Sequence, residues 1–127
     1  MELAQASLAR CRAVPEFFPT FYELLLASTP EIPPLFAHTK FARQHKLLEH
    51  GLGLLLIYAK RPNPSLLERI AVRHARADLN VPAHLYPHFV VSLLAAVRRH
   101  DPQCGADVEE AWRTALKPGI EYMKSRY

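Results

Sequence analysis

The sequence predicts a single all-α domain, on the basis of three observations. Apolar residues recur at helical spacing along nearly the whole chain, and no stretch alternates apolar and polar residues as a half-buried strand does. The chain contains no Asn-Gly or Asp-Gly pair, the dipeptides typical of tight hairpin turns. Its prolines fall largely where helices are expected to start or stop. With 127 residues, 50% of them hydrophobic, the chain is long enough for one compact core and too short for two ordinary domains.

The first half of the chain is expected to contain three helices and one corner. We expect helices over residues 2–12, 16–28 and 40–60. The proline-punctuated stretch "TPEIPPLF", residues 29–36, forms the corner and has one short helical turn. The two longer helices each carry a stripe predicted to face inward: Phe18, Phe21, Tyr22 and Leu25 in the first, and Phe41, Gln44, Leu48, Leu52 and Leu55 in the second.

The second half is expected to contain three more helices. The break "RPNPS" ends the long helix, and Ser65 is placed to cap the next helix, over residues 65–77. After the loop "ADLNVP" we expect helices over 84–100, with Pro87 near its start, and over 107–125, where Pro118 introduces a kink. Their inward faces are predicted to carry Phe89, Leu93 and Val97 in the first, and Val108, Trp112, Ala115, Leu116 and Met123 in the second.

Composition excludes several classes of partner. The formal charge is +4, but basic and acidic residues are interleaved, with no long basic run and no basic-aromatic ladder, so no nucleic-acid partner is expected. The longest apolar stretch, "GLGLLLIYA", is half of the about 20 residues that a membrane helix needs, and no signal peptide is visible. Cys11 and Cys104 form no CxxC pair and are expected to be free thiols. These features predict a cytoplasmic protein without a membrane partner.

One histidine lies on a helix face that is expected to be buried. Leu66, Ile70 and His74 recur every fourth residue and so share one stripe of the 65–77 helix. A buried imidazole needs a hydrogen-bond partner, because an unpaired polar group in the core is costly. His74 is therefore either a satisfied core histidine or a nitrogen ligand for something held in the core.

Five segments, taken in chain order, resemble the bacterial single-domain globins over nearly the whole chain. "FYELLLASTPEIPPLF" resembles the second helix and the corner that ends in a haem-stacking phenylalanine, and "RQHKLL" resembles the distal segment. "ERIAVRHA" is similar to the proximal segment, "VPAHLYPHFVVSLL" to the start of the next helix, and "VEEAWRTA" to the start of the last. The resemblance implies a globin fold of about six to seven helices around a haem pocket, in one globin domain over residues 1–127.

The chain also departs from the globin pattern. Eight positions separate Phe36 from Gln44, which leaves no room for the extra short helix (the D helix) of longer globins. Val81 follows His74 by seven positions where globins commonly have five, so the loop is two residues longer. Leu116 occupies the position of a tyrosine in the last helix, and Tyr127 lies where its glutamate partner is expected, which argues against peroxidase-like activation.

The resemblance implies a haem b cofactor with His74 as the proximal iron ligand. We expect the other ring nitrogen of His74 to donate to a carbonyl one turn earlier, near Ile70. Tyr22 and Gln44 are the distal candidates, because dioxygen in such a pocket carries partial negative charge that a hydroxyl or amide donor stabilises, whereas carbon monoxide gains much less. His45 is expected to face away. Further candidates are apolar walls of the pocket, namely Phe36, Phe41, Leu48, Ile70, Val81 and Phe89, and basic residues able to pair with haem propionates, namely Arg43, Lys46 and Arg76.

Several functions are compatible with these residues. Reversible binding of dioxygen or another diatomic gas, for oxygen transport, is the leading interpretation, and it involves no catalytic residue. A nitric oxide dioxygenase would need a separate reductase, because the chain has no GxGxxG motif. A haem-based gas sensor would act through a partner protein. A haem-free interaction module is a fourth alternative, against which His74 argues. The sequence leaves open whether the protein is a monomer or a homodimer.

Overall fold

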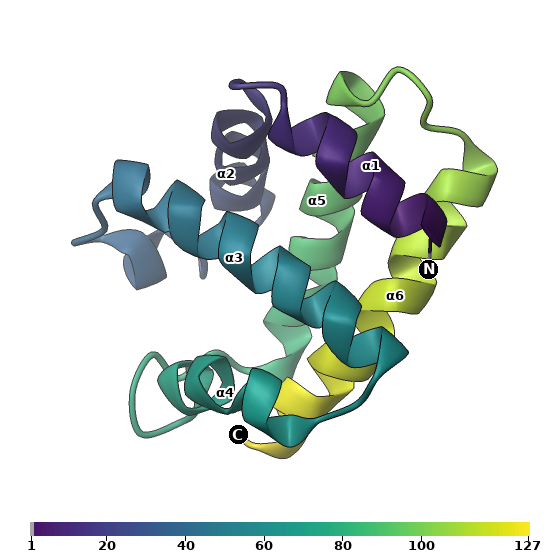
Figure 1. Cartoon of the computed structure of the whole chain (residues 1–127). Coiled ribbons are helices and arrows are strands. Elements are labelled where there is room, and N and C mark those ends of the chain that lie inside the picture. Colours follow the sequence, from purple (N-terminus) through teal and green to yellow (C-terminus); the bar gives the residue numbers. More distant parts are fainter. Residues whose placement is uncertain (1) are drawn as a thin grey trace.

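The computed structural model describes residues 2–127, and every regular element in that range is helical (Figure 1). The all-α fold is therefore confirmed. The helices are α1 (Glu2–Arg12), α2 (Phe17–Ser28), α3 (Phe41–Lys60), α4 (Glu68–His74), α5 (Tyr86–His100) and α6 (Ala106–Ser125). Three 3₁₀ turns precede α3, α4 and α5: η1 (Pro33–Phe36), η2 (Pro64–Leu66) and η3 (Ala83–Leu85). Helix α3 begins shortly after η1, with no further helix between them, as the short spacing before Gln44 predicted.

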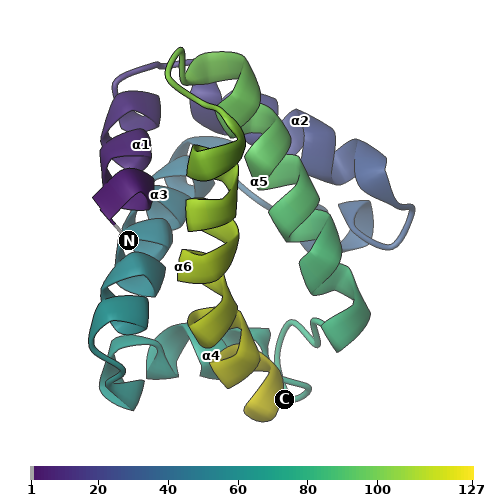
Figure 2. The same cartoon turned by 90° about the vertical axis from the view of Figure 1, so that its right-hand side faces the viewer.

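Two crossing pairs of helices form the body of the molecule. Helix α2 packs on α5, α3 packs on α6, and α1 lies across the start of α6 (Figures 1 and 2). The largest fully buried side chains come from these helices and from the residue that precedes α4: Phe17, Phe21, Leu52, Leu56, Leu67, Leu93, Trp112 and Leu116. Within residues 2–127, no helix combines the length and the apolar character needed to cross a membrane.

The helix expected over residues 65–77 is shorter than predicted. Residues Pro64–Leu66 form a 3₁₀ turn, and the α-helix starts at Glu68 and ends at His74, because Ala75 is extended with φ −71° and ψ 169°. Ser65 does not cap an α-helix. The side chain of Asn63 instead accepts a hydrogen bond from the Ser65 amide at 3.1 Å and starts the 3₁₀ turn.

The face of α4 that is buried most deeply is not the stripe read from the sequence. Leu67 and Ala71 are fully buried against the body of the protein, whereas Ile70 and His74 are half-buried. Helix α4 packs mainly on α6, so the residues next to the predicted stripe enter the core. His74 therefore faces along the edge of the core rather than into its centre.

The crossing of α3 over α6 depends on a glycine that follows a helical proline. Pro118 lies inside α6, and the helix continues through it to Ser125. A β-carbon on Gly119 would lie 2.4 Å from Leu55 Cδ2 on α3 and 3.3 Å from Leu67 Cδ1 ahead of α4. The bare backbone at Gly119 is therefore what lets the side chains of two other elements rest on α6.

A buried polar network joins α1, the end of α5 and α6. Asp101 is 2% exposed and accepts hydrogen bonds from Ser7 Oγ at 2.6 Å, from Arg10 Nε at 2.6 Å and from Arg10 Nη2 at 2.9 Å. Trp112 Nε1 donates to the same Ser7 hydroxyl at 2.9 Å. Burial by itself would raise the pKa of the Asp101 carboxyl, but the hydrogen bonds from Arg10 and Ser7 outweigh it, and the pKa lies below its ordinary value.

Replacing Gly119 by alanine should destabilise the protein. The added methyl group would overlap Leu55, and relieving that overlap in a packed core costs about 1–3 kcal/mol, which outweighs the roughly 0.5–1 kcal/mol that alanine gains in a helix. Gly53→Ala is the matched control, because a β-carbon there would have an Arg12 side-chain atom 4.0 Å away as its nearest neighbour. That variant should gain roughly 0.5–1 kcal/mol through helix propensity. Urea denaturation measures both, and equal effects of the two variants would contradict the close packing at Gly119.

The Asp101 network should make the stability depend on pH in the acid range. Because the pKa of Asp101 is lower in the folded than in the unfolded chain, its contribution is present above the ordinary value of 3.8 and is lost as the pH falls through the folded value. Asp101→Asn should remove about 1–3 kcal/mol at neutral pH and flatten this acid dependence. Denaturation as a function of pH measures both effects, and Glu23→Gln on the exposed face of α2 serves as the control.

Candidate functional site

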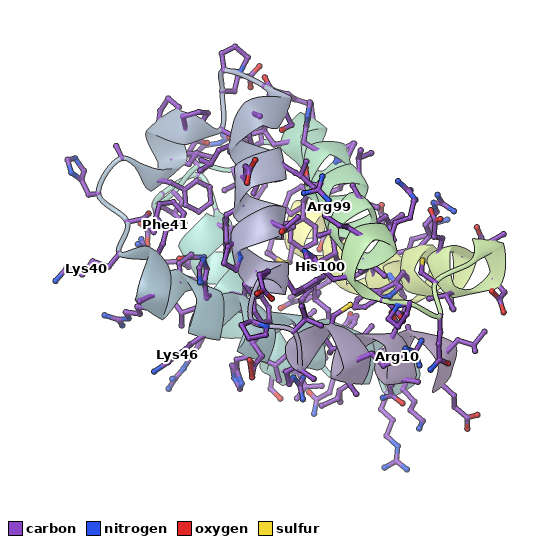
Figure 3. All side chains as sticks on the ribbon, turned by 90° about the horizontal axis from the view of Figure 1, so that it is seen from above. Arg10, Lys40, Phe41, Lys46, Arg99 and His100 are labelled. Carbon is purple, nitrogen blue, oxygen red and sulfur yellow. The ribbon has the colours of Figure 1, made fainter. Side chains whose placement is uncertain are left out.

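Aromatic rings gather where the corner meets α2 and the start of α3. Tyr22 is 4% exposed, and the rings of Phe36 and Phe41 meet it edge-on with centroids 5.7 and 5.5 Å away. Phe36 and Phe41 stack on each other at 6.0 Å. Figure 3 shows Lys40 and Lys46 extending outward from this end of α3, away from the body of the molecule. The site thus has an apolar inner side and a basic outer side.

Tyr22 and Gln44, both singled out from the sequence, are bonded directly to each other. Gln44 Nε2 donates a hydrogen bond to the Tyr22 hydroxyl oxygen at 2.9 Å. The phenolic proton remains free to be donated elsewhere, because a hydroxyl group can accept and donate at the same time. Burial raises the pKa of Tyr22 to about 12 although the Gln44 bond opposes the shift, so at neutral pH the group is an uncharged donor.

His45 does not face away from this cluster as expected. Its ring stacks on Tyr22 with centroids 5.5 Å apart and on Phe18 at 6.3 Å, and the residue is half-buried. Tyr22 lies over the start of α3 and so contacts two adjacent helical positions through different parts of its side chain. Burial lowers the pKa of the His45 ring, which favours the neutral form in this stack.

His74 is the last residue of α4, and one of its two ring nitrogens is already hydrogen-bonded within the helix. Nδ1 lies 2.7 Å from the Ile70 carbonyl oxygen, and since a carbonyl can only accept, Nδ1 carries the proton. This is the hydrogen bond expected one turn earlier in the helix. Nε2 has no hydrogen-bond partner among residues 2–127. Burial lowers the pKa of His74 despite the bond to Ile70, so the ring is a neutral imidazole with an available lone pair on Nε2.

The loop that follows His74 closes on itself. The Val81 amide donates to the His74 carbonyl at 2.9 Å, and the Asn80 amide donates to the Ala75 carbonyl at the same distance. Asn80 adopts a left-handed backbone with φ 55°, a conformation that asparagine tolerates better than most residues. The two extra positions between His74 and Val81 are therefore taken up in a closed turn, and Val81 stays beside His74.

The remaining wall candidates are half-buried and border the same region. Ile70 Cδ1 lies 3.8 Å from the position that a β-carbon on Gly51 would take, so α4 contacts α3 one turn beyond the half-buried Leu48. Phe89 on α5 meets Phe21 edge-on at 5.5 Å. Hydrogen bonds and ring contacts thus join the candidates into two groups within the described chain, one around Tyr22 and one around His74.

A cavity of about 370 Å³ lies between the corner and the end of α4. This volume falls in the range of small-ligand sites. Its lining comes from the two sides of the candidate site, Pro34, Leu35, Ala37, His38 and Thr39 from the corner, and Arg73, Asp78 and Leu79 from α4 and its loop. Tyr22, Gln44 and His74 are not among the lining residues. In residues 2–127 no group of three or more His, Cys, Asp or Glu side chains is placed to hold a metal ion, so His74 would act as a single protein ligand.

The basic residues considered as partners of haem propionates lie in two different parts of the structure. Arg43 and Lys46 are exposed on α3, and Lys46 borders a second, shallow cavity with Arg12 and Glu49. The guanidinium of Arg76 lies 4.9 Å over the Tyr127 ring. Sequence reasoning missed this pair and the stack of His45 on Tyr22, because neither contact follows from the spacing of residues along one helix.

Comparison with known proteins gives one informative match. No protein-family model and no curated protein matches the chain. The structure is similar to the crystal structure of a protein from Pseudomonas aeruginosa PAO1 that is described as structurally highly homologous to a human hemoglobin. The two share 37% sequence identity and superpose with a TM-score of 0.96, over 99% of this chain and 96% of that one. At this identity and coverage, the two proteins are similar in sequence as well as in fold.

Proposed function

The chain belongs to the globin family, and we propose that it holds haem b through His74 and binds a diatomic gas beside Tyr22, for oxygen transport. The observation that carries this proposal is the state of His74. Its Nδ1 is fixed by the Ile70 carbonyl, while Nε2 keeps its lone pair and has no protein partner among the described residues. A neutral, oriented imidazole on the edge of an apolar region is the donor that haem iron requires.

The surrounding residues fit a flat apolar cofactor. Half-buried apolar side chains border the region on the side of the corner and on the side of α4, among them Phe36, Phe41, Leu48 and Ile70. When bound, haem supplies an iron atom that takes an imidazole on one face and leaves the other face open to a gas. Neither Cys11 nor Cys104 lies in a C-x-x-C-H sequence, so the cofactor would be held without covalent attachment.

Tyr22 would provide the polar contact to the gas. Its hydroxyl already accepts from Gln44, so its own proton is available to another acceptor. Its pKa of about 12 keeps the group protonated, which makes it a donor rather than an anionic ligand. Gln44 would act through Tyr22 by fixing the direction of the hydroxyl. A neutral donor in an apolar site favours a gas that becomes partly negative, such as dioxygen, over carbon monoxide.

His74→Ala should abolish stable haem retention. The variant removes the one nitrogen donor assigned to the iron, so the purified protein should lose its Soret absorbance, and added imidazole should restore part of it by filling the space left. His88→Ala, a half-buried histidine on α5, is the control and should keep the spectrum. A wild-type protein that stays colourless with added hemin, or a His88 variant that behaves as the His74 variant should, would refute the assignment.

Tyr22→Phe should raise the oxygen dissociation rate roughly tenfold and change carbon monoxide release far less, because it deletes one buried hydrogen-bond donor and keeps the ring. Gln44→Leu should have a smaller effect of the same kind, since Gln44 donates to Tyr22. In the Tyr22→Phe background, Gln44→Leu should add almost nothing. Stopped-flow oxygen release from the two single variants and the double variant measures this order. Independent, additive effects would show that Gln44 acts on the gas directly.

A further inference from the structure

Helix α4, which ends at His74, is too short to hold its own position. It has seven residues, and isolated helices shorter than about 12 residues are marginal in water. Its main packing partner is α6, with smaller contacts to the 3₁₀ turn before it. The orientation of the His74 ring therefore depends on contacts made by another part of the chain.

The start of α4 is held by the end of α6. Both oxygens of the Glu68 carboxylate are engaged: Oε2 accepts from the Tyr122 hydroxyl at 2.5 Å, and Oε1 accepts from Arg126 Nη2 at 2.5 Å. These donors lie on the last turn of α6 and directly after it. Hydrogen bonds from both residues lower the pKa of the Glu68 carboxyl, so it is charged at neutral pH.

The loop behind His74 is held by the next residue of the same segment. Tyr127 accepts a backbone hydrogen bond from the Arg76 amide at 3.2 Å, and the Arg76 guanidinium lies 4.9 Å over its ring. The Tyr127 hydroxyl donates to the side chain of Asn80, the residue with the left-handed backbone. Figures 1 and 2 both show this end of the chain beside α4.

We propose that Tyr122, Arg126 and Tyr127, here called the α6 strap, are positioning residues for His74. They hold Glu68, six residues before the histidine, and Asn80, six residues after it, so His74 is bracketed on both sides. The idea rests on the proposed function, because the strap matters most if His74 ligates iron. Leu116 and Tyr127 stand where the globin pattern has a tyrosine and a glutamate, and a different tyrosine–glutamate pair, Tyr122 and Glu68, fixes the helix that carries His74.

Each contact of the strap is partly exposed, and single exposed ion pairs contribute little. The strap works because several contacts from one short segment act on both ends of a short helix. Losing one anchor should therefore change local opening of residues 68–80 by about three- to tenfold rather than unfold the protein.

The test compares Glu68→Ala and Tyr127→Ala with Glu121→Ala in the full-length, haem-loaded protein. Glu121 pairs with Lys124 on the same turn of α6, at 3.4 Å, and so matches the substitution without affecting α4. Hydrogen exchange should quicken about three- to tenfold in residues 68–80 of the first two variants and nowhere in the control. The ferrous iron–imidazole vibration should broaden or shift, and haem should transfer faster to an excess of a scavenging globin.

Combining substitutions tests whether Glu68 acts through the strap. The triple variant Glu68→Ala, Tyr122→Phe, Arg126→Gln should be no worse than Glu68→Ala alone, because Glu68→Ala already removes both hydrogen bonds that the two donors make. Wild-type haem uptake with exchange and vibration unchanged in the variants would overturn the strap, and so would exchange that quickens equally throughout the chain. A wild-type chain that takes up no haem would instead overturn the proposed function.

Discussion

The approach of α3 to α6 at Gly119 is the constraint on which the rest of the structure depends. Leu55 from α3 occupies the space that a side chain on Gly119 would need, and Leu67, directly before α4, lies beside that space. Helix α3 carries Gln44 near its start, and α4 carries His74 at its end. Because both helices rest on one patch of α6, that patch sets the spacing between the two polar residues of the candidate site. A larger residue at position 119 would change the site from a distance.

The candidate site is an apolar region with two polar groups, and each group has one hydrogen-bonding position filled and one unfilled. The bond from Gln44 satisfies the Tyr22 oxygen and leaves the phenolic proton, and the Ile70 carbonyl satisfies one nitrogen of His74 and leaves the other. Burying polar groups is costly unless they are paired, so each is paired once, which makes its burial tolerable. The remaining proton and lone pair are the chemically active groups of the site.

Much of the fold could be predicted from the sequence, because the apolar residues of long amphipathic helices recur with a recognisable period. The bounds of α1, α2, α3, α5 and α6 lie within two residues of the predicted ranges. Helix α4 could not be delimited, since its end and its buried face are set by contacts with α6 and Tyr127 that lie far away in sequence. In the site, helical spacing pointed to His74, and the resemblance to bacterial globins pointed to Tyr22 and Gln44. The direct bond from Gln44 and the inward stack of His45 depend on side-chain rotamers, which no spacing specifies.

The loop after His74 is closed by a hydrogen bond, so the positions of its two ends do not depend on its length. The bond from the Val81 amide to the His74 carbonyl holds the two ends together whatever lies between them. Insertions or deletions at residues 77–79, between the two residues that contact Tyr127, would therefore change the size of a surface loop while α5 keeps its starting point. A change of length confined to these three residues would alter the contour of the protein surface beside the cavity lined by Asp78 and Leu79, at little cost to the helices on either side.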